Sequence, residues 1–291
     1  MMNIDPAKLF DLAGKRAAIT GAGGALCGTL AEGLAALGVQ VALLDLNLEA
    51  ARHREQVINT AASRADAYGS ASAFACDVLD EESLERCYQD ICNRWGGVDL
   101  LINGAGGNNP AGSTDVEFLE VGGLDEESRR NFFNLSASGF RSTFDLNFFG
   151  TFLSTKILAR GMAERGMGSI LNISSMSALS PLTKVGAYSA AKAAVANFTK
   201  WLAVHLSHTG VRVNAIAPGF FMTEQLRFLH IDETTGEYTP RAKKVVAHTP
   251  MGRYGEAEDL LGTVIWLLSD ASKFVTGNVV PIDGGFSSFS I

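Results

Sequence analysis

Short apolar runs alternate with longer amphipathic stretches along almost the whole chain. Several of the runs are apolar throughout, as expected for parallel strands that are buried on both faces. The predicted strands are Arg16–Thr20, Val39–Leu44, Ala71–Ala75, Val98–Ile102, Ser169–Ile173, Arg212–Ala217 and Val279–Ile282. Between them, apolar side chains recur every three or four residues, as on the buried faces of helices. The pattern predicts an α/β fold with a doubly wound, parallel seven-stranded sheet and helices on both faces, in a single domain over residues 1–291.

Two segments interrupt this alternation. Residues 108–141 form a long insertion between a strand and the next helix, and residues 224–250 form a second one. Ligands bind outside the carboxyl ends of the strands in open α/β sheets, so we expect both segments to wall the substrate site, the second as a lid. The Gly-, Thr- and Asp-rich middle of the second predicts a hairpin-like turn or a mobile loop. The alternative is ordinary decoration far from the site.

Composition narrows the class of protein. The chain is 47% hydrophobic and 19% charged, which suits a globular domain with a sizeable core. Its 24 basic and 31 acidic residues give a net charge of −7, so we expect no nucleic acid and no membrane surface as partners. No apolar run approaches the ~18 residues of a transmembrane helix, and the opening residues lack a signal-peptide pattern. We therefore expect a soluble, cytoplasmic protein.

The four cysteines do not form a metal-binding pattern. Cys27, Cys76, Cys87 and Cys92 are scattered through apolar or helical stretches, without CxxC pairs or clustered histidines. We expect buried thiols in a reducing compartment and no bound metal.

A glycine-rich turn, TGAGGALCG at residues 20–28, follows the first predicted strand and opens a helix. Its backbone N–H groups could approach a pyrophosphate, although such turns also serve other ligands or packing alone. Asp45, at the end of the second strand, can accept hydrogen bonds from an adenosine ribose; a solvated turn acid is the alternative reading. Asp45 would repel a 2′-phosphate and Leu46 offers no compensating cation, so NAD is favoured over NADP as cofactor.

Tyr188 and Lys192 lie four residues apart in a stretch that predicts a helix, so both side chains face the same side. A phenol with a reference pKa of ~10 is a poor base at neutral pH, but a nearby ammonium favours its ionised form. The pair could therefore act in general acid/base catalysis. Pairs at this spacing also occur by chance on exposed helices.

Six motifs decide between these readings: TGAGG (20–24), Asp45, NGAGG (103–107), NISS (172–175), YSAAK (188–192) and PGFFMT (218–223), in this order. Together they strongly resemble the short-chain dehydrogenase/reductase family, over nearly the whole chain from about Leu12 to the closing IDGGF. The resemblance implies a Rossmann-type fold and hydride transfer between a nicotinamide cofactor and a substrate carbon.

The resemblance also implies roles for individual residues. Tyr188 would pass a proton to or from the substrate oxygen, while Lys192 would lower the pKa of Tyr188 and hold the nicotinamide ribose. Ser175 would polarise the substrate oxygen by hydrogen bonding. Asn147 would brace a helix kink and position a water for the proton relay. The implied cofactor-binding residues are Gly21, Gly23, Gly24, Leu26, Asp45, Leu46, Asp77, Val78, Asn103, Ala105, Tyr188, Lys192, Pro218, Gly219, Phe221 and Thr223.

The chain departs from the usual family pattern in its glycine motifs. Ala25 and Cys27 stand where TGxxxGxG has glycines. Glycines at positions 23, 24 and 28 partly compensate, and we expect the small side chains to admit a pyrophosphate. Gly104 replaces the second asparagine of the commoner NNAG, a change that we expect to matter little.

Within the family, the chain looks most like the bacterial D-mannonate oxidoreductase, or fructuronate reductase, branch. Polar residues that could bind a sugar acid are Asn108, Asn109, Lys184, Arg227 and Arg253, although each alone could be a solvated loop residue. Other polyol, gluconate-type or hydroxy-ketone substrates remain alternatives, as do a non-catalytic dinucleotide sensor and a methyltransferase. The family resemblance also implies a homotetramer or homodimer.

Overall fold

The computed structural model describes residues 5–64, 68–124, 126, 128–223, 227–232 and 234–290. Seven parallel strands form one sheet in the order β3-β2-β1-β4-β5-β6-β7. The strands are β1 (Arg16–Thr20), β2 (Gln40–Asp45), β3 (Ala71–Ala75), β4 (Leu100–Asn103), β5 (Gly168–Ile173), β6 (Val211–Pro218) and β7 (Val279–Ile282). The predicted seven-stranded Rossmann-type sheet is confirmed.

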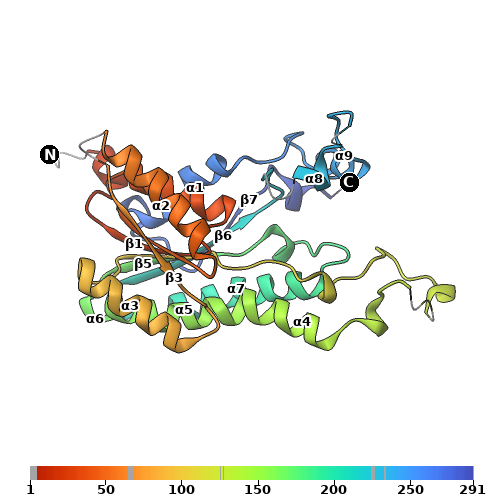
Figure 1. The fold of residues 1–291 in the computed structure, drawn as a ribbon, viewed down its shortest axis with the longest axis horizontal. Helices are drawn as coiled ribbons and strands as arrows, with labels where there is room; N and C mark the ends of the chain where they lie inside the picture. The colour runs from red at the N-terminus through yellow and green to blue at the C-terminus, as the bar shows by residue number, and fades with distance from the viewer. Residues whose placement is uncertain are drawn as a thin grey trace.

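Helices cover both faces of this sheet (Figure 1). One face packs against α1 (Ala25–Ala36), α2 (Leu48–Ala62) and α10 (Leu261–Leu268). The other packs against α3 (Glu81–Trp95), α5 (Gly150–Leu158), α6 (Arg160–Arg165) and α7 (Gly186–His205). Alternation along β1 divides the core between them, because Ala17 and Ile19 belong to the first cluster and Ala18 to the second.

The strand order reverses next to β1, where ligands bind in sheets of this kind. The chain runs from β1 outward to β2 and β3, and then crosses to β4 on the other side of β1. Thr20 is in register with Asn103, the last residue of β4. The turn after β1 and the turn after β4 therefore leave the same edge of the sheet side by side.

The insertion after β4 holds three short 3₁₀ turns, η2 (Pro110–Gly112), η3 (Val121–Gly123) and η4 (Phe132–Asn134), before α4 (Ala137–Phe144). An ion pair of 2.7 Å between Arg130 and Asp115 closes it into a loop. A π-helical turn, η5 (Asp145–Phe149), then joins α4 to α5.

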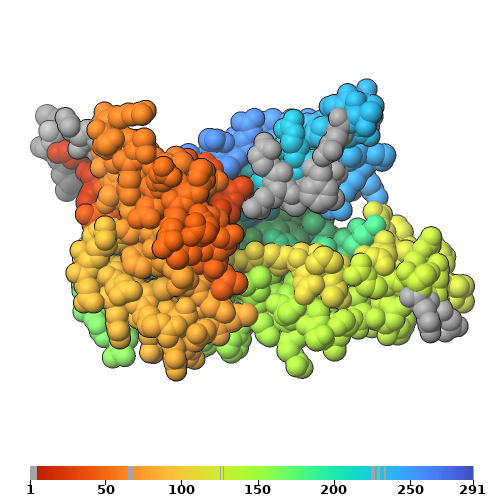
Figure 2. Space-filling model, viewed as in Figure 1, coloured from red at the N-terminus to blue at the C-terminus, as the bar shows by residue number. Residues whose placement is uncertain are grey.

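The segment after β6 contains α8 (Arg227–His230) and α9 (Pro240–His248). Between them Ile231 forms an antiparallel bridge with Tyr238, and Gly236 takes a left-handed conformation, so the predicted hairpin-like turn is confirmed. Lys244 of α9 and Glu117 of the insertion form an ion pair of 2.8 Å. The two segments thus meet at the end of the molecule that lies to the right in both views (Figures 1 and 2).

Three further findings concern the described part of the chain. None of its helices is both long enough and apolar enough to cross a membrane. Its four cysteines are free thiols; Cys27, Cys76 and Cys87 are buried as predicted, whereas Cys92 is half-buried. Its His, Cys, Asp and Glu side chains form no group of three or more that could hold a metal ion.

Candidate active site

Helix α7 places Tyr188 and Lys192 at the carboxyl end of β5. Lys192 is 4% exposed, and its Nζ donates a hydrogen bond of 2.8 Å to the carbonyl of Ile173, the last residue of β5. Nζ also lies 5.6 Å from the centroid of the Tyr188 ring. The Ser174 hydroxyl donates to the Lys192 carbonyl over 2.9 Å and so ties the helix to the end of the strand. The predicted proximity of the phenol and the ammonium is present.

Burial controls the protonation of this pair. It lowers the pKa of Lys192 to about 8, because a buried ammonium loses its hydration. It also raises the pKa of Tyr188, and a hydrogen bond with Ser175 offsets only part of this. The pKa of Tyr188 is therefore raised rather than lowered as we expected, since burial outweighs the influence of its neighbours.

Ser175 is the second residue after β5 and begins the short turn η6 (Met176–Ala178). Its Oγ accepts a hydrogen bond of 3.1 Å from the Ser177 N–H. The hydroxyl proton is then available for donation, and Ser175 shares a hydrogen bond with Tyr188. Two hydroxyls therefore converge where a substrate oxygen would need proton donors.

Asn147 lies in the π-helical turn η5 and is fully buried. Its Nδ2 donates to the carbonyls of Thr143 over 2.8 Å and Gly107 over 2.6 Å, and its Oδ1 accepts from the Gly107 N–H over 3.2 Å. Turns of this kind are often found at functional sites. Asn147 thus links an irregular helix to the loop after β4, in line with the bracing role that the resemblance implies.

The glycine-rich turn leaves an open cradle at the start of α1. Gly21 has φ +70°, and a Cβ there would lie 2.9 Å from the backbone of Ala105. Gly24 is the N-cap residue of α1. Because it has no side chain, an anion can approach the start of the helix. Asp45 Oδ2 accepts a hydrogen bond of 2.9 Å from the Gly23 N–H. A carboxylate beside free helix N–H groups fits a dinucleotide without a 2′-phosphate.

Other residues predicted to contact the cofactor surround this cradle in different ways. The Ala105 N–H donates to Thr20 Oγ1 over 3.1 Å, and Asp77 Oδ1 accepts from the Leu79 N–H over 2.9 Å. Val78, which follows Asp77 in the turn after β3, is buried. Leu26 is half-buried on α1, whereas the Leu46 side chain is 76% exposed.

Asn103 is oriented into the protein interior. Its Nδ2 donates to Thr155 Oγ1 and to Asn172 Oδ1, each over 2.8 Å. Asn172 in turn donates to Thr199 Oγ1 over 2.9 Å. This buried chain of hydrogen bonds joins α5, β4, β5 and α7, so the amide of Asn103 supports the site from below.

The loop after β6 contains four predicted cofactor residues, Pro218, Gly219, Phe221 and Thr223. The Gly219 N–H donates to the Ile282 carbonyl over 2.9 Å, and a Cβ on Gly219 would lie 2.7 Å from Asp283 Cα. The Phe221 side chain packs in the core cluster and also borders the cavity that Arg253 lines. Pro218 ends β6, and Thr223 is half-buried at the edge of the loop.

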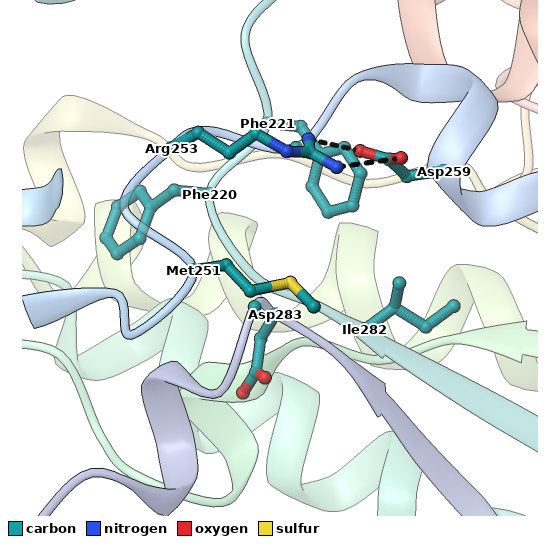
Figure 3. A pocket seen from close by; sticks show the side chains of 9 residues that line it. Phe220, Phe221, Met251, Arg253, Asp259, Ile282 and Asp283 are labelled. Carbon is teal, nitrogen blue, oxygen red and sulfur yellow. Dashed lines mark hydrogen bonds and ion pairs between the residues drawn. The ribbon is translucent and has the colours of Figure 1, made fainter.

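Arg253 lines a separate cavity of about 220 Å³ behind this loop, together with Phe220, Phe221, Met251 and Ile282 (Figure 3). Its guanidinium binds both carboxylate oxygens of Asp259, at 2.6 and 3.1 Å. The charge of Arg253 is therefore already paired, and the structure does not join it to Tyr188 and Ser175.

The other residues predicted to bind substrate are distributed around the insertion and the lid. Asn109 is used within the insertion, because its Oδ1 accepts from the Ala111 N–H and its Nδ2 donates to Ser142, each over 2.9 Å. Asn108 donates to Ser113 Oγ over 2.9 Å. Lys184 is exposed and precedes α7, and Arg227 is exposed at the start of α8. The lid residues 224–226 and 233 lie outside the described residues.

Three residues contribute to the site without having been predicted. Thr20 Oγ1 accepts from the N–H groups of both Gly104 and Ala105, each over 3.1 Å. Its place before Gly21 in TGAGG was the available signal. Arg241 and Lys244 on α9 act on Glu117 of the insertion, where a hydrogen bond from Lys244 and the nearby cations lower the pKa of the carboxyl. The basic run PRAKK inside the predicted lid could have pointed to them.

A family profile and individual proteins of similar sequence match this chain over almost its full length. The family profile described as enoyl-(acyl carrier protein) reductase matches residues 21–287. The uncharacterized oxidoreductase UxuB of Bacillus subtilis (strain 168) is 48% identical over 281 residues, which cover 96% of this chain and 97% of UxuB. Gluconate 5-dehydrogenase of Gluconobacter oxydans (strain 621H) is 35% identical over 280 residues, which cover 96% of this chain and 97% of that enzyme.

Solved structures share the same architecture. One from Haemophilus influenzae, described as a candidate D-mannonate oxidoreductase with bound NAD, superposes with a TM-score of 0.89 at 47% identity, covering 96% of this chain and 97% of that one. A short-chain type dehydrogenase/reductase from Mycobacterium marinum gives a TM-score of 0.79 at 28% identity, covering 96% and 98%. With the ordered motifs and the Ser175, Tyr188 and Lys192 arrangement, these matches show that the chain belongs to the short-chain dehydrogenase/reductase family.

Proposed function

We propose that this protein is an NAD-dependent oxidoreductase that interconverts a secondary alcohol and a ketone. The observation that carries the proposal is the convergence of Ser175, Tyr188 and Lys192 at the carboxyl end of β5, beside the cradle of the glycine-rich turn. A sensor without catalysis would have no use for these three groups, and a methyltransferase has no use for the phenol and ammonium pair.

The residues around the cradle would hold the cofactor. The backbone N–H groups of residues 21–24 already donate within the protein, so the first N–H groups of α1 suit a pyrophosphate. Asp45 suits the two hydroxyls of an adenosine ribose. Asp77 and Val78 would flank the adenine, and the backbone of residues 218–223 would face the nicotinamide. When bound, the nicotinamide donates or accepts the hydride.

The protein's own groups then handle the proton. During ketone reduction, Tyr188 Oη donates its proton to the substrate oxygen, and the Ser175 hydroxyl donates a hydrogen bond to the same atom. Lys192 contributes a positive charge that stabilises the phenolate left on Tyr188. Asn147 fixes the loop at Gly107 and so holds the floor of the site in place. Alcohol oxidation reverses these steps.

We further propose a sugar acid as the substrate, most specifically the pair D-mannonate and D-fructuronate. Support comes from the Haemophilus influenzae relative described as a candidate D-mannonate oxidoreductase. A sugar acid also needs a cationic partner for its carboxylate, and Lys184, Arg241 and Lys244 together lower the pKa of Glu117 at the junction of insertion and lid. These cations line the proposed substrate walls.

A gluconate-type substrate is the second candidate within the same chemistry. It is favoured by the 35% identity to a gluconate 5-dehydrogenase over nearly the whole chain.

The test of both substrate proposals is NADH consumption by the purified protein with D-fructuronate, tagaturonate, 5-ketogluconate and fructose, repeated with NADPH. Preference for D-fructuronate with NADH supports the first proposal, and preference for 5-ketogluconate the second. Inactivity on all four, with intact NADH binding, would contradict both substrate proposals.

Two further properties belong to the proposal. Free, buried thiols suit a reducing compartment such as the cytoplasm. A homodimer or homotetramer would cover an apolar surface on α4, η5, α5 and α7, where five large side chains are exposed: Phe140, Phe149, Phe152, Trp201 and Val204. Light scattering on the purified protein measures this oligomeric state directly.

A further inference from the structure

Cys27 and Gly104, two residues that depart from the family's glycine motifs, contact each other. A Cβ added to Gly104 would overlap Cys27 Sγ and would lie 2.9 Å from the carbonyl oxygen of Thr20, while Cys27 Cβ would remain at an ordinary distance of 3.6 Å. The φ of Gly104 lies outside the left-handed region, so the preference for glycine comes from the neighbouring atoms, foremost the Cys27 thiol. The thiol of Cys27 therefore occupies the space in which a side chain at position 104 would lie.

The thiol has little freedom to move out of this space. Cys27 is 6% exposed and belongs to the core cluster beneath β1 and α1. Thr20 Oγ1 holds the opposing loop from below, because it accepts the N–H groups of Gly104 and Ala105 at 3.1 Å. Cys27 and Thr20 thus form the surface on which the loop after β4 rests.

The same loop contacts catalytic residues two positions further on. A Cβ on Gly106 would lie 2.6 Å from Asn147 Oδ1 and 3.2 Å from Lys192 Nζ. Both the N–H and the carbonyl of Gly107 are hydrogen-bonded to the Asn147 side chain. A displacement of the loop at Gly104 would therefore reach Asn147 and Lys192 directly.

We propose that Cys27 is a positioning residue, which fixes the position of the loop at residues 104–107 relative to Asn147 and Lys192. Gly104 is then required by the Cys27 thiol together with the Thr20 carbonyl, so positions 27 and 104 are matched in size. The catalytic part of this inference rests on the proposed function, whereas the packing part does not. Each part has its own experiment.

The packing part is tested by a double-mutant cycle on thermal unfolding. We expect Gly104→Ala to lower Tm by about 4–8 °C and Cys27→Ala to lower it by about 2–4 °C. The double variant should lose less than the sum of the two single losses, and the loss that remains reflects the Thr20 carbonyl, which a Cβ would approach to 2.9 Å. Gly107→Ala is the matched control, because a Cβ there has no neighbour within 4 Å. Additive losses in the double variant would overturn the pairing, and an insoluble Gly104→Ala that Cys27→Ala rescues would support it.

The catalytic part is tested by kinetics on the same variants. Gly104→Ala should lower kcat by roughly tenfold to a hundredfold and shift the pH profile, because a misplaced loop moves Lys192 and Asn147. Cys27→Ala/Gly104→Ala should recover part of the kcat that Gly104→Ala loses, because only the Thr20 carbonyl still opposes the added Cβ. Cys92→Ala, on α3, is the control that keeps activity. Unchanged kcat and pH profile in a folded Gly104→Ala would refute the positioning role. Absence of dehydrogenase activity in the wild type would instead refute the proposed function and leave the stability cycle valid.

Discussion

The carboxylate of Asp45 accepts a hydrogen bond of 2.9 Å from the backbone N–H of Gly23. This bond brings the negative charge at the end of β2 to the glycine-rich turn that leads into α1. We propose that this charge selects between the two nicotinamide cofactors, since it can accept hydrogen bonds from ribose hydroxyls and repels a 2′-phosphate.

Replacing Asp45 by Ala should therefore weaken NAD binding more than NADP binding. Hydrogen bonds to a charged group are worth about 1.5–3 kcal/mol, so we expect roughly a tenfold to hundredfold loss of NADH affinity. Fluorescence titration with NADH and NADPH measures both constants. Asp77→Asn, at the end of the neighbouring strand, serves as a comparison, and an unchanged ratio of affinities in Asp45→Ala would show that Asp45 does not read the ribose.

Tyr188→Phe should lower turnover by at least about 10³-fold, because it removes the group that donates the proton. The ring stays in place, so NADH affinity should remain within about twofold of the wild type. Steady-state kinetics and NADH fluorescence provide the two readouts. Turnover close to that of the wild type would contradict the assignment of Tyr188 as the acid.

The pH dependence of kcat/KM for NAD should show a descending limb near pH 8. Burial lowers the pKa of Lys192 to about 8, so the ammonium is present below this pH and is lost above it. Rates measured from pH 6 to 10 locate the limb. Lys192→Arg keeps its charge over this range, so the limb should disappear in that variant even if its overall rate is lower. A limb that persists in Lys192→Arg belongs to another group.

Asp99→Asn should destabilise the protein by about 2–4 kcal/mol at pH 7, because it breaks a nearly buried ion pair. Asp99 Oδ1 lies 2.6 Å from Arg16 Nη2 and 3.4 Å from Arg165 Nη2. Burial alone would raise the pKa of Asp99, but the hydrogen bonds and charge of Arg16, helped by Arg165, keep it below its ordinary value. This stabilisation is present above the unfolded pKa of about 3.9 and is lost as pH falls through the lower folded pKa.

Urea unfolding at pH 7 and at pH 3 checks this prediction. The difference in the free energy of unfolding between the wild type and Asp99→Asn should be smaller at pH 3 than at pH 7. Glu49→Gln is the control, since the ion pair of Glu49 with Arg52 is exposed and should contribute little. A gap that does not depend on pH would mean that the carboxylate charge is not the source of the stability.

Lys184 combines an exposed charge with strained backbone, since its φ of +70° is unfavourable for a residue with a side chain. Lys184→Met removes the charge alone, whereas Lys184→Gly removes the charge and also relieves the backbone. If the ammonium binds the substrate carboxylate, both should raise KM for a sugar acid by roughly tenfold, with Lys184→Gly the more stable by about 1 kcal/mol. A KM that rises in neither variant removes Lys184 from the substrate site.

The sheet could be predicted from the sequence because its strands are buried on both faces and their residues are apolar. Ile19 and Leu43 pack in the same core cluster, and the runs that contain them show no competing helical period. The ends of the strands were predicted less accurately than the strands themselves. Asp45 is the last residue of β2, although the apolar run ends at Leu44, because the register with β3 continues to Ala75.

The residues proposed as catalytic could be picked out from the sequence because their motifs are local, but the orientation of polar side chains could not be predicted. Asn103 and Asn109 were placed at ligand sites, yet Asn103 donates to Thr155 and Asn172, and Asn109 to Ser142. These partners come from segments far away in the chain. The contact of Cys27 with Gly104 has the same origin, since a side chain at position 104 would overlap a thiol that lies far away in the sequence.

The ion pair between Lys244 and Glu117 gives the opening of the proposed site a dependence on salt. Exposed pairs of this kind break and reform readily, and mobile ions screen them within about 8 Å at physiological ionic strength. The anionic substrate proposed above would be attracted to the same cations that lower the pKa of Glu117. Arrival of such a substrate and release of the lid from the insertion would therefore be one exchange of partners, in which a carboxylate from solution replaces a carboxylate of the protein.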